Sequence, residues 1–154
     1  ACGDAMRGLW GMVWAAVGQL AIGLIVTNPW VVPDLLLGSL VVASTAPGPF
    51  ARLTPALVGG ALAMMMAGRE PLLAGLSYAG AGGVVAVASA RWDLSEWSAQ
   101  AVAVAMLETC LIAVWLIADQ TLSGRLLLWG LGKTVLTLAC LPWVRRLVGT
   151  SPHG

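Results

Sequence analysis

The chain has 154 residues, of which 59% are hydrophobic and only 10% are charged. Soluble domains carry roughly 25% charged residues. Eight Lys and Arg with seven Asp and Glu are therefore too few to cover a water-facing surface. This composition excludes a soluble enzyme, a nucleic-acid-binding protein and a secreted disulfide-rich module. The net charge of +1 also provides no long-range field that would steer a charged partner.

Apolar runs long enough for membrane helices, about 20 residues each, follow one another along the chain. The predicted spans cover residues 8–27, 30–46, 50–68, 71–90, 97–118 and 122–144. The first run is too long for the core of a signal peptide, so we expect it to be retained. The second and third are short, which leaves open a tilted or partly re-entrant segment. We therefore expect an all-α, polytopic membrane helix bundle with about six transmembrane helices and short loops.

The arginines predict the orientation of this bundle. One set of span ends carries Arg7, Arg52, Arg91, Arg145 and Arg146, and the other set carries Arg69 and Arg125. Short loops rich in Lys and Arg stay in the cytoplasm, so we expect both termini to be cytoplasmic. Tryptophans lie near the same boundaries, as in aromatic belts: Trp10, Trp92, Trp97 and Trp143 at one, and Trp30, Trp115 and Trp129 at the other.

Small residues recur every four positions in the fourth span, at Gly75, Ala79 and Gly83. Such a stripe lets a second helix approach closely, which favours association in lipid. The stripe serves either packing inside the bundle or docking of a partner helix.

Two ionisable residues lie deep in apolar runs, Glu108 in the fifth span and Lys133 in the sixth. Each is costly to leave alone in hydrocarbon, so a partner is expected. Because their charges are opposite and their depths similar, we expect them to face one another or to share a small polar pocket. The alternatives are a pair that only fixes helix register, a proton or ligand site, and a contact with a partner subunit.

The sequence predicts no catalytic, cofactor-binding or metal site. The only histidine, His153, lies outside the apolar segments, which argues against a catalytic triad and against haem ligation. Gly132-Lys133-Thr134 resembles the end of a phosphate-binding loop, but position 127 is leucine where that loop needs glycine. Met64, Met65 and Met66 are consecutive on a helix and so point in different directions, which excludes shared metal ligation.

One order of motifs does resemble a known family. Pro33 and Asp34 open an apolar helix, a turn with Pro47 and Pro49 follows, and a glycine-bearing helix leads to the sequence Arg-Glu-Pro-Leu-Leu at residues 69–73. This order resembles the MreD family of the bacterial rod-shape system, whose last helix similarly contains a tryptophan and ends in Arg-Arg. The family commonly has an aspartate where this chain has Met64, so the role of that acid is absent here or carried by Glu108.

The resemblance implies a non-enzymatic scaffold in the bacterial inner membrane. Such a protein binds the single-span protein MreC and works with MreB filaments and the RodA–penicillin-binding-protein synthase in peptidoglycan synthesis, cell elongation and cell shape. Two alternatives remain. One is the substrate-binding subunit of a small-solute, vitamin-type transporter, whose polar candidates are Gln19, Asp34, Ser77, Tyr78, Gln100, Glu108 and Lys133. The other is an accessory packing subunit of a larger membrane complex.

Overall fold

The computed structural model describes residues 2–120 and 123–149, and every regular element in this part of the chain is helical. The elements in order are α1 (Cys2–Ile25), the short 3-10 helix η1 (Pro29–Val31), α2 (Leu35–Ala43), α3 (Pro49–Met66), α4 (Pro71–Ala88), α5 (Trp97–Ala118) and α6 (Gly124–Val148). All of these except η1 and α2 are long and apolar enough to cross a membrane, which makes five candidate spans in the described residues. The predicted all-helical fold is thus confirmed for the described residues, and their five long apolar helices are compatible with the predicted membrane bundle.

The outer surface of the bundle is strongly apolar. Large hydrophobic side chains that are more than half exposed occur on every long helix, among them Trp10, Leu24, Phe50, Leu57, Leu76, Met106, Leu128 and Trp143. A soluble monomer rarely exposes a continuous apolar surface of this kind. The structure therefore shows lipid-compatible faces where the composition predicted them.

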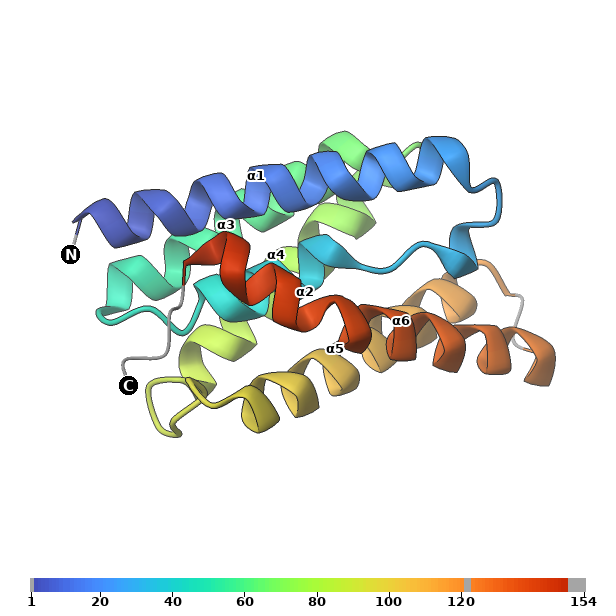
Figure 1. Cartoon of the computed structure of the whole chain (residues 1–154). Helices are drawn as coiled ribbons and strands as arrows, with labels where there is room; N and C mark the ends of the chain where they lie inside the picture. The colour runs from blue at the N-terminus through green and yellow to red at the C-terminus, as the bar shows by residue number, and fades with distance from the viewer. Residues whose placement is uncertain (1, 121–122, 150–154) are drawn as a thin grey trace.

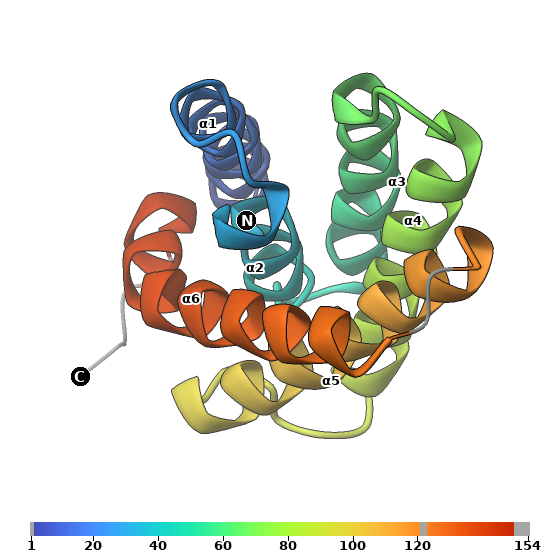
Figure 2. The same cartoon turned by 90° about the vertical axis from the view of Figure 1, so that its right-hand side faces the viewer.

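The long helices run back and forth between the two ends of the bundle (Figure 1), and α5 and α6 cross α1 and α3 obliquely (Figure 2). The start of α1 lies against the end of α6, since a Cβ placed on Gly11 would come within 2.9 Å of the Leu147 carbonyl oxygen. The beginning of the first helix and the end of the last helix therefore share one end of the bundle.

The predicted span at residues 30–46 differs most from expectation, because it is not one continuous helix. It consists of η1, a non-helical stretch and α2, which has only nine residues. At 1.5 Å per residue α2 is about 14 Å long, less than half of the roughly 30 Å hydrocarbon core. η1 and α2 together still lead the chain from the end of α1 to the start of α3 (Figure 1).

Proline explains the break before α2. A residue that precedes proline is pushed out of the helical region, and Val32 before Pro33 has φ −84° and ψ 118°. Pro33 therefore lies ahead of the helix, whereas the sequence had suggested a place for it in the first helical turn. The helix begins only after Asp34, which is its N-cap residue.

α2 is the core of the molecule even though it is the shortest α-helix in the described residues. All of its residues from Leu36 to Ala43 are buried, and α2 contacts α1, α3, α4, α5 and α6. Viewed along the bundle, it lies between the longer helices (Figure 2). Non-helical backbone at membrane depth is tolerated where it is enclosed by protein, and this position provides that enclosure.

Candidate functional site

The amino end of α2 is held by hydrogen bonds from several other helices. Its N-cap carboxylate, Asp34 Oδ1, accepts from the Leu37 N–H at 2.9 Å. The Asp34 N–H donates to Thr137 Oγ1 of α6 at 2.8 Å. The Leu36 N–H donates to Gln19 Oε1 of α1 at 2.9 Å. Backbone groups at helix starts lack partners within the helix, so these side chains replace the bonds that the break removes.

Four residues around this helix start form what we call the polar cluster: Asp34, Tyr78, Glu108 and Thr137. The Tyr78 hydroxyl donates to Asp34 Oδ2. The Thr137 hydroxyl has two acceptors, Glu108 Oε1 at 2.9 Å and the Lys133 carbonyl oxygen at 3.1 Å. Asp34, Glu108 and Thr137 are each at most 3% exposed. Thr137 therefore connects two buried acidic residues, Asp34 and Glu108, in one hydrogen-bond network.

Two buried side chains on α5 have polar atoms that lack a hydrogen-bond partner among the described residues. These are Glu108 Oε2 and the side-chain amide of Gln100, which lies two turns before Glu108 on α5. Both residues are at most 1% exposed. Glu108 is therefore anchored at one oxygen only, by Thr137.

Lys133 lies apart from the Glu108 carboxylate. Within the described residues, no ion pair within 4.0 Å joins the two side chains, and the Lys133 side chain lines an open groove with Gln19, Thr27 and Pro29. Side chains on a helix lean toward its amino end, and α5 and α6 run in opposite directions (Figure 1). Glu108 and Lys133 therefore lean apart, and only the Lys133 backbone carbonyl joins the cluster.

The predicted small-residue stripe divides between two faces of α4. A Cβ on Gly75 would lie 2.2 Å from Met64 Cγ of α3, and a Cβ on Gly60 would lie 3.0 Å from Ala79 Cβ. Gly75 and Ala79 thus pack inside the α3–α4 pair. A Cβ on Gly83 would meet nothing within 4 Å.

Gly82 takes the third place in the contact between α3 and α4. A Cβ there would lie 2.7 Å from Ala56 Cα and Cβ. Two helical turns cover slightly more than seven residues, so i, i+4 and i+7 stay closer to one line than i, i+4 and i+8. The spacing of four that suggested Gly83 drifts off the contact face by the third member.

Gly83 precedes Val84, which lines a hollow on the outside of the bundle that we call the α4–α5 groove. Its volume is about 510 Å³, and small side chains contribute to its walls, including Ala88, Ala99 and Ala103. A second hollow of about 390 Å³, which Gly83 lines, adjoins it and shares Val84, Ala88 and Trp92. α4 and α5 make few contacts with each other, which leaves this groove open.

Sequence reasoning missed Thr137 and gave Tyr78 and Gln19 no specific role. A threonine in an apolar helix carries little signal, because its hydroxyl can bond to the carbonyl four residues earlier in the same helix. The available clue was that Glu108 had been expected to point toward Lys133, and Thr137 lies one helical turn after Lys133. Ser77, a further polar candidate, is half-buried on α4 outside the cluster.

The cavity nearest the cluster is small. It has a volume of about 180 Å³ and is lined by Gln19, Leu36, Ala63, Met66, Ala67, Ala74, Tyr78 and Trp115. Pockets for small molecules usually measure about 300–1,000 Å³ and present several convergent polar groups. The two polar side chains here, Gln19 and Tyr78, already bond to the backbone and the N-cap carboxylate of the α2 start.

Comparison with known proteins gives no relative: no protein-family profile, no curated protein and no solved structure matches the chain.

Proposed function

We propose that this chain is a non-enzymatic membrane scaffold of the MreD kind, which binds a single-span, MreC-like protein in the bacterial inner membrane. The observation that carries the proposal is how the buried polar side chains are used. The cluster residues and Gln19 bond to the broken helix or to each other. Their hydrogen-bonding groups hold the fold together. Gln19 also lines the open groove of about 540 Å³ that Lys133 lines, but its side-chain oxygen is already bound to the Leu36 N–H.

In this proposal the chain crosses the membrane six times, with both termini in the cytoplasm. The segment of η1 and α2 serves as the second crossing, in two short pieces. The adjoining ends of α1 and α6 support an even number of crossings. The excess of arginines at that end supports its cytoplasmic placement, where contact with MreB-type filaments would also occur.

The α4–α5 groove is the best candidate for the partner helix. Small residues let helix backbones approach closely in lipid, where van der Waals contact drives association. Ala88, Ala99 and Ala103 supply such a surface, and Gly83 adds an open position beside it. The groove is also apolar, with Val102 and Met106 along α5, and its α5 wall from Ser98 to Leu107 rises about 14 Å.

The test uses two matched variants on the same helix, Gly83→Leu and Gly80→Leu. Neither position would meet an atom within 4 Å on gaining a Cβ, so both variants should fold. Of the two, only Gly83 lines the hollow that adjoins the groove. An overpacked contact costs about 1–3 kcal/mol, so we expect Gly83→Leu to weaken partner binding by about five- to 150-fold and Gly80→Leu to leave it unchanged.

The measurement is recovery of co-expressed MreC-like protein with the affinity-purified chain after gentle detergent extraction. Equal recovery with both variants would refute the groove as the docking site. Extraction from native membranes without any single-span partner would refute the scaffold proposal. Thermal stabilisation of the purified chain by a metabolite would support the transporter alternative, and recovery with a pigment-bearing or respiratory complex would support the accessory-subunit alternative.

A further inference from the structure

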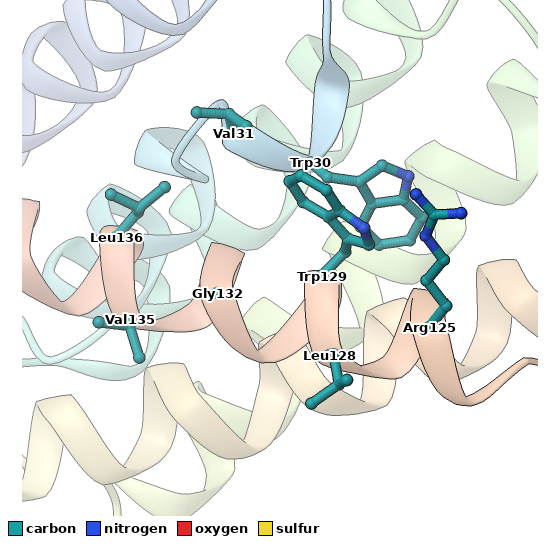
Figure 3. A pocket seen from close by; sticks show the side chains of 8 residues that line it. All are labelled: Trp30, Val31, Arg125, Leu128, Trp129, Gly132, Val135 and Leu136. Carbon is teal, nitrogen blue, oxygen red and sulfur yellow. The ribbon is translucent and has the colours of Figure 1, made fainter.

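A second groove lies where η1 meets the first half of α6. Its volume is about 590 Å³, and its walls come from Trp30, Val31, Arg125, Leu128, Trp129, Gly132, Val135 and Leu136. Figure 3 shows the guanidinium of Arg125 extending toward the indoles of Trp30 and Trp129 at one end of this groove. Val135 and Leu136 form the other end.

Trp30 is held in place by the turn that contains it. The Asn28 side chain accepts a hydrogen bond from the Trp30 N–H at 3.1 Å, which caps η1. The Trp30 ring reaches α6, where its Cζ3 lies 3.9 Å from a Cβ built on Gly130. One wall of the groove is therefore a fixed aromatic surface.

The groove runs along α6 for a distance that suits one leaflet of a bilayer. From Arg125 to Leu136 the helix rises about 16 Å, and half of a typical hydrocarbon core is about 15 Å. Arg125 lies in the first turn of α6, at the end of the bundle away from the α1 start (Figure 1). Gly132 keeps the middle of the groove open, because a Cβ there would meet no atom within 4 Å.

The polar end of the groove favours an anion. Arg125 is the only charged residue that lines it, and within the described residues no acidic side chain lies within ion-pair distance of its guanidinium. The first turn of a helix also carries a partial positive charge, which disfavours a cation and attracts an anion. Arginine matches the geometry of a phosphate, with which it forms paired hydrogen bonds.

We propose that this groove binds one anionic phospholipid. Its phosphate lies against Arg125 beside the two tryptophans, and one acyl chain follows Leu128, Gly132 and Val135 toward the bilayer centre. The tryptophan rings suit the headgroup boundary, where amphipathic aromatic side chains concentrate. The proposal requires only that the bundle lies in a membrane, and it does not depend on the partner at the α4–α5 groove.

The experiment measures binding of phosphatidylglycerol and phosphatidylcholine to the full chain in detergent by native mass spectrometry. These lipids share acyl chains and differ in headgroup charge. We expect wild type to bind phosphatidylglycerol at least about tenfold more tightly. Arg125→Gln should reduce this preference to about twofold or less, while Arg125→Lys should restore part of it because it keeps the charge.

Two matched controls separate the site from general effects. Arg69→Gln removes an exposed arginine from the same end of the bundle and should leave the preference intact. Gly132→Leu fills the groove and should weaken the binding of both lipids, whereas Gly80→Leu should weaken the binding of neither. Equal binding of the two lipids to wild type, or an undiminished preference in Arg125→Gln, would overturn the proposal. Occupation of the groove by a co-purifying protein that displaces the lipid would overturn it as well.

Discussion

Thr137 gives the sharpest test of how the broken helix is held. Thr137→Val keeps the shape of the side chain but removes the hydroxyl that accepts from the Asp34 N–H and donates to Glu108 Oε1. A buried donor left without an acceptor costs about 1–3 kcal/mol. Side-chain hydrogen bonds in membranes average only about 0.6 kcal/mol, because unfolded segments in lipid find other partners. Since the lost acceptor serves a backbone N–H at a helix break, we expect a loss of about 2 kcal/mol.

Thr134→Val is the matched control, one turn earlier on the same face of α6. Thr134 is also buried, at 7% exposure, but its hydroxyl bonds only to the Gly130 carbonyl oxygen within its own helix, at 3.1 Å. Its removal orphans no donor, so we expect a change within about 0.5 kcal/mol.

The assay is unfolding of the purified chain in detergent, followed by tryptophan fluorescence. For a chain of this length, 2 kcal/mol corresponds to a fall in Tm of roughly 4–8 °C. Thr137→Ser, which keeps a hydroxyl, should recover most of the loss. If Thr137→Val and Thr134→Val lowered stability equally, the cluster would not be what holds the start of α2, and the reasoning would fail.

Two further predictions concern packing and pH. Gly82→Ala places a Cβ 2.7 Å from Ala56 Cα and should lower the free energy of unfolding by about 1–3 kcal/mol, whereas Gly80→Ala meets open space and should raise it by about 0.5–1 kcal/mol. Changes of the same sign in detergent unfolding would contradict this account. In the loop before α5, hydrogen bonds from the Ser95 hydroxyl and N–H hold the pKa of Asp93 below its ordinary value of 3.8. Its stabilising effect is therefore present above about pH 3.8 and is lost as pH falls through the lower, folded-state pKa. Asp93→Asn should flatten the acid limb of a Tm-against-pH curve, and an unchanged limb would show that this turn contributes nothing.

The long helices could be predicted from the sequence because bilayer thickness sets their length, and each helix therefore appears as an apolar run of about that length. The helix at 97–118 has the predicted bounds, and the helix predicted from residue 71 begins at Pro71. α1 begins earlier than predicted, at Cys2, and its first turns include Asp4 and Arg7, which precede the apolar run.

The break before α2 was harder to predict from apolar periodicity. A segment buried in protein and a segment facing lipid are equally apolar, so residues 30–46 have the composition of an ordinary span. The distinguishing signal was conformational, since Pro33 restricts Val32 to an extended backbone. Asp34 was expected near the amino end of a helix, but its role as the cap of a buried half-helix depends on contacts from distant residues.

The sequence also predicted that Glu108 and Lys133 lie at similar depth, but it did not determine where their side chains point. Depth follows from counting residues, whereas direction depends on how the two helices are rotated against each other. Thr137 occupies the position facing Glu108, and Lys133 turns toward the groove beside Thr27. A long lysine side chain can reach the membrane boundary by snorkelling, so a direct counter-ion is not required at this position.

The cluster also bears on how the outer surfaces work. The side chains that bond to the start of α2 come from α1, α4 and α6, through Gln19, Tyr78 and Thr137. Glu108 of α5 joins them through Thr137. One short helix therefore ties four long helices together at their centre. The long helices supply most of the residues that line both proposed grooves, and sites built on rigid elements hold their geometry better than sites on loops. Loosening the cluster with Thr137→Val should then weaken the binding of both the partner helix and the lipid. A variant on one groove, by contrast, should affect only its own ligand, and this difference separates a role in the interior of the bundle from a role on its surface.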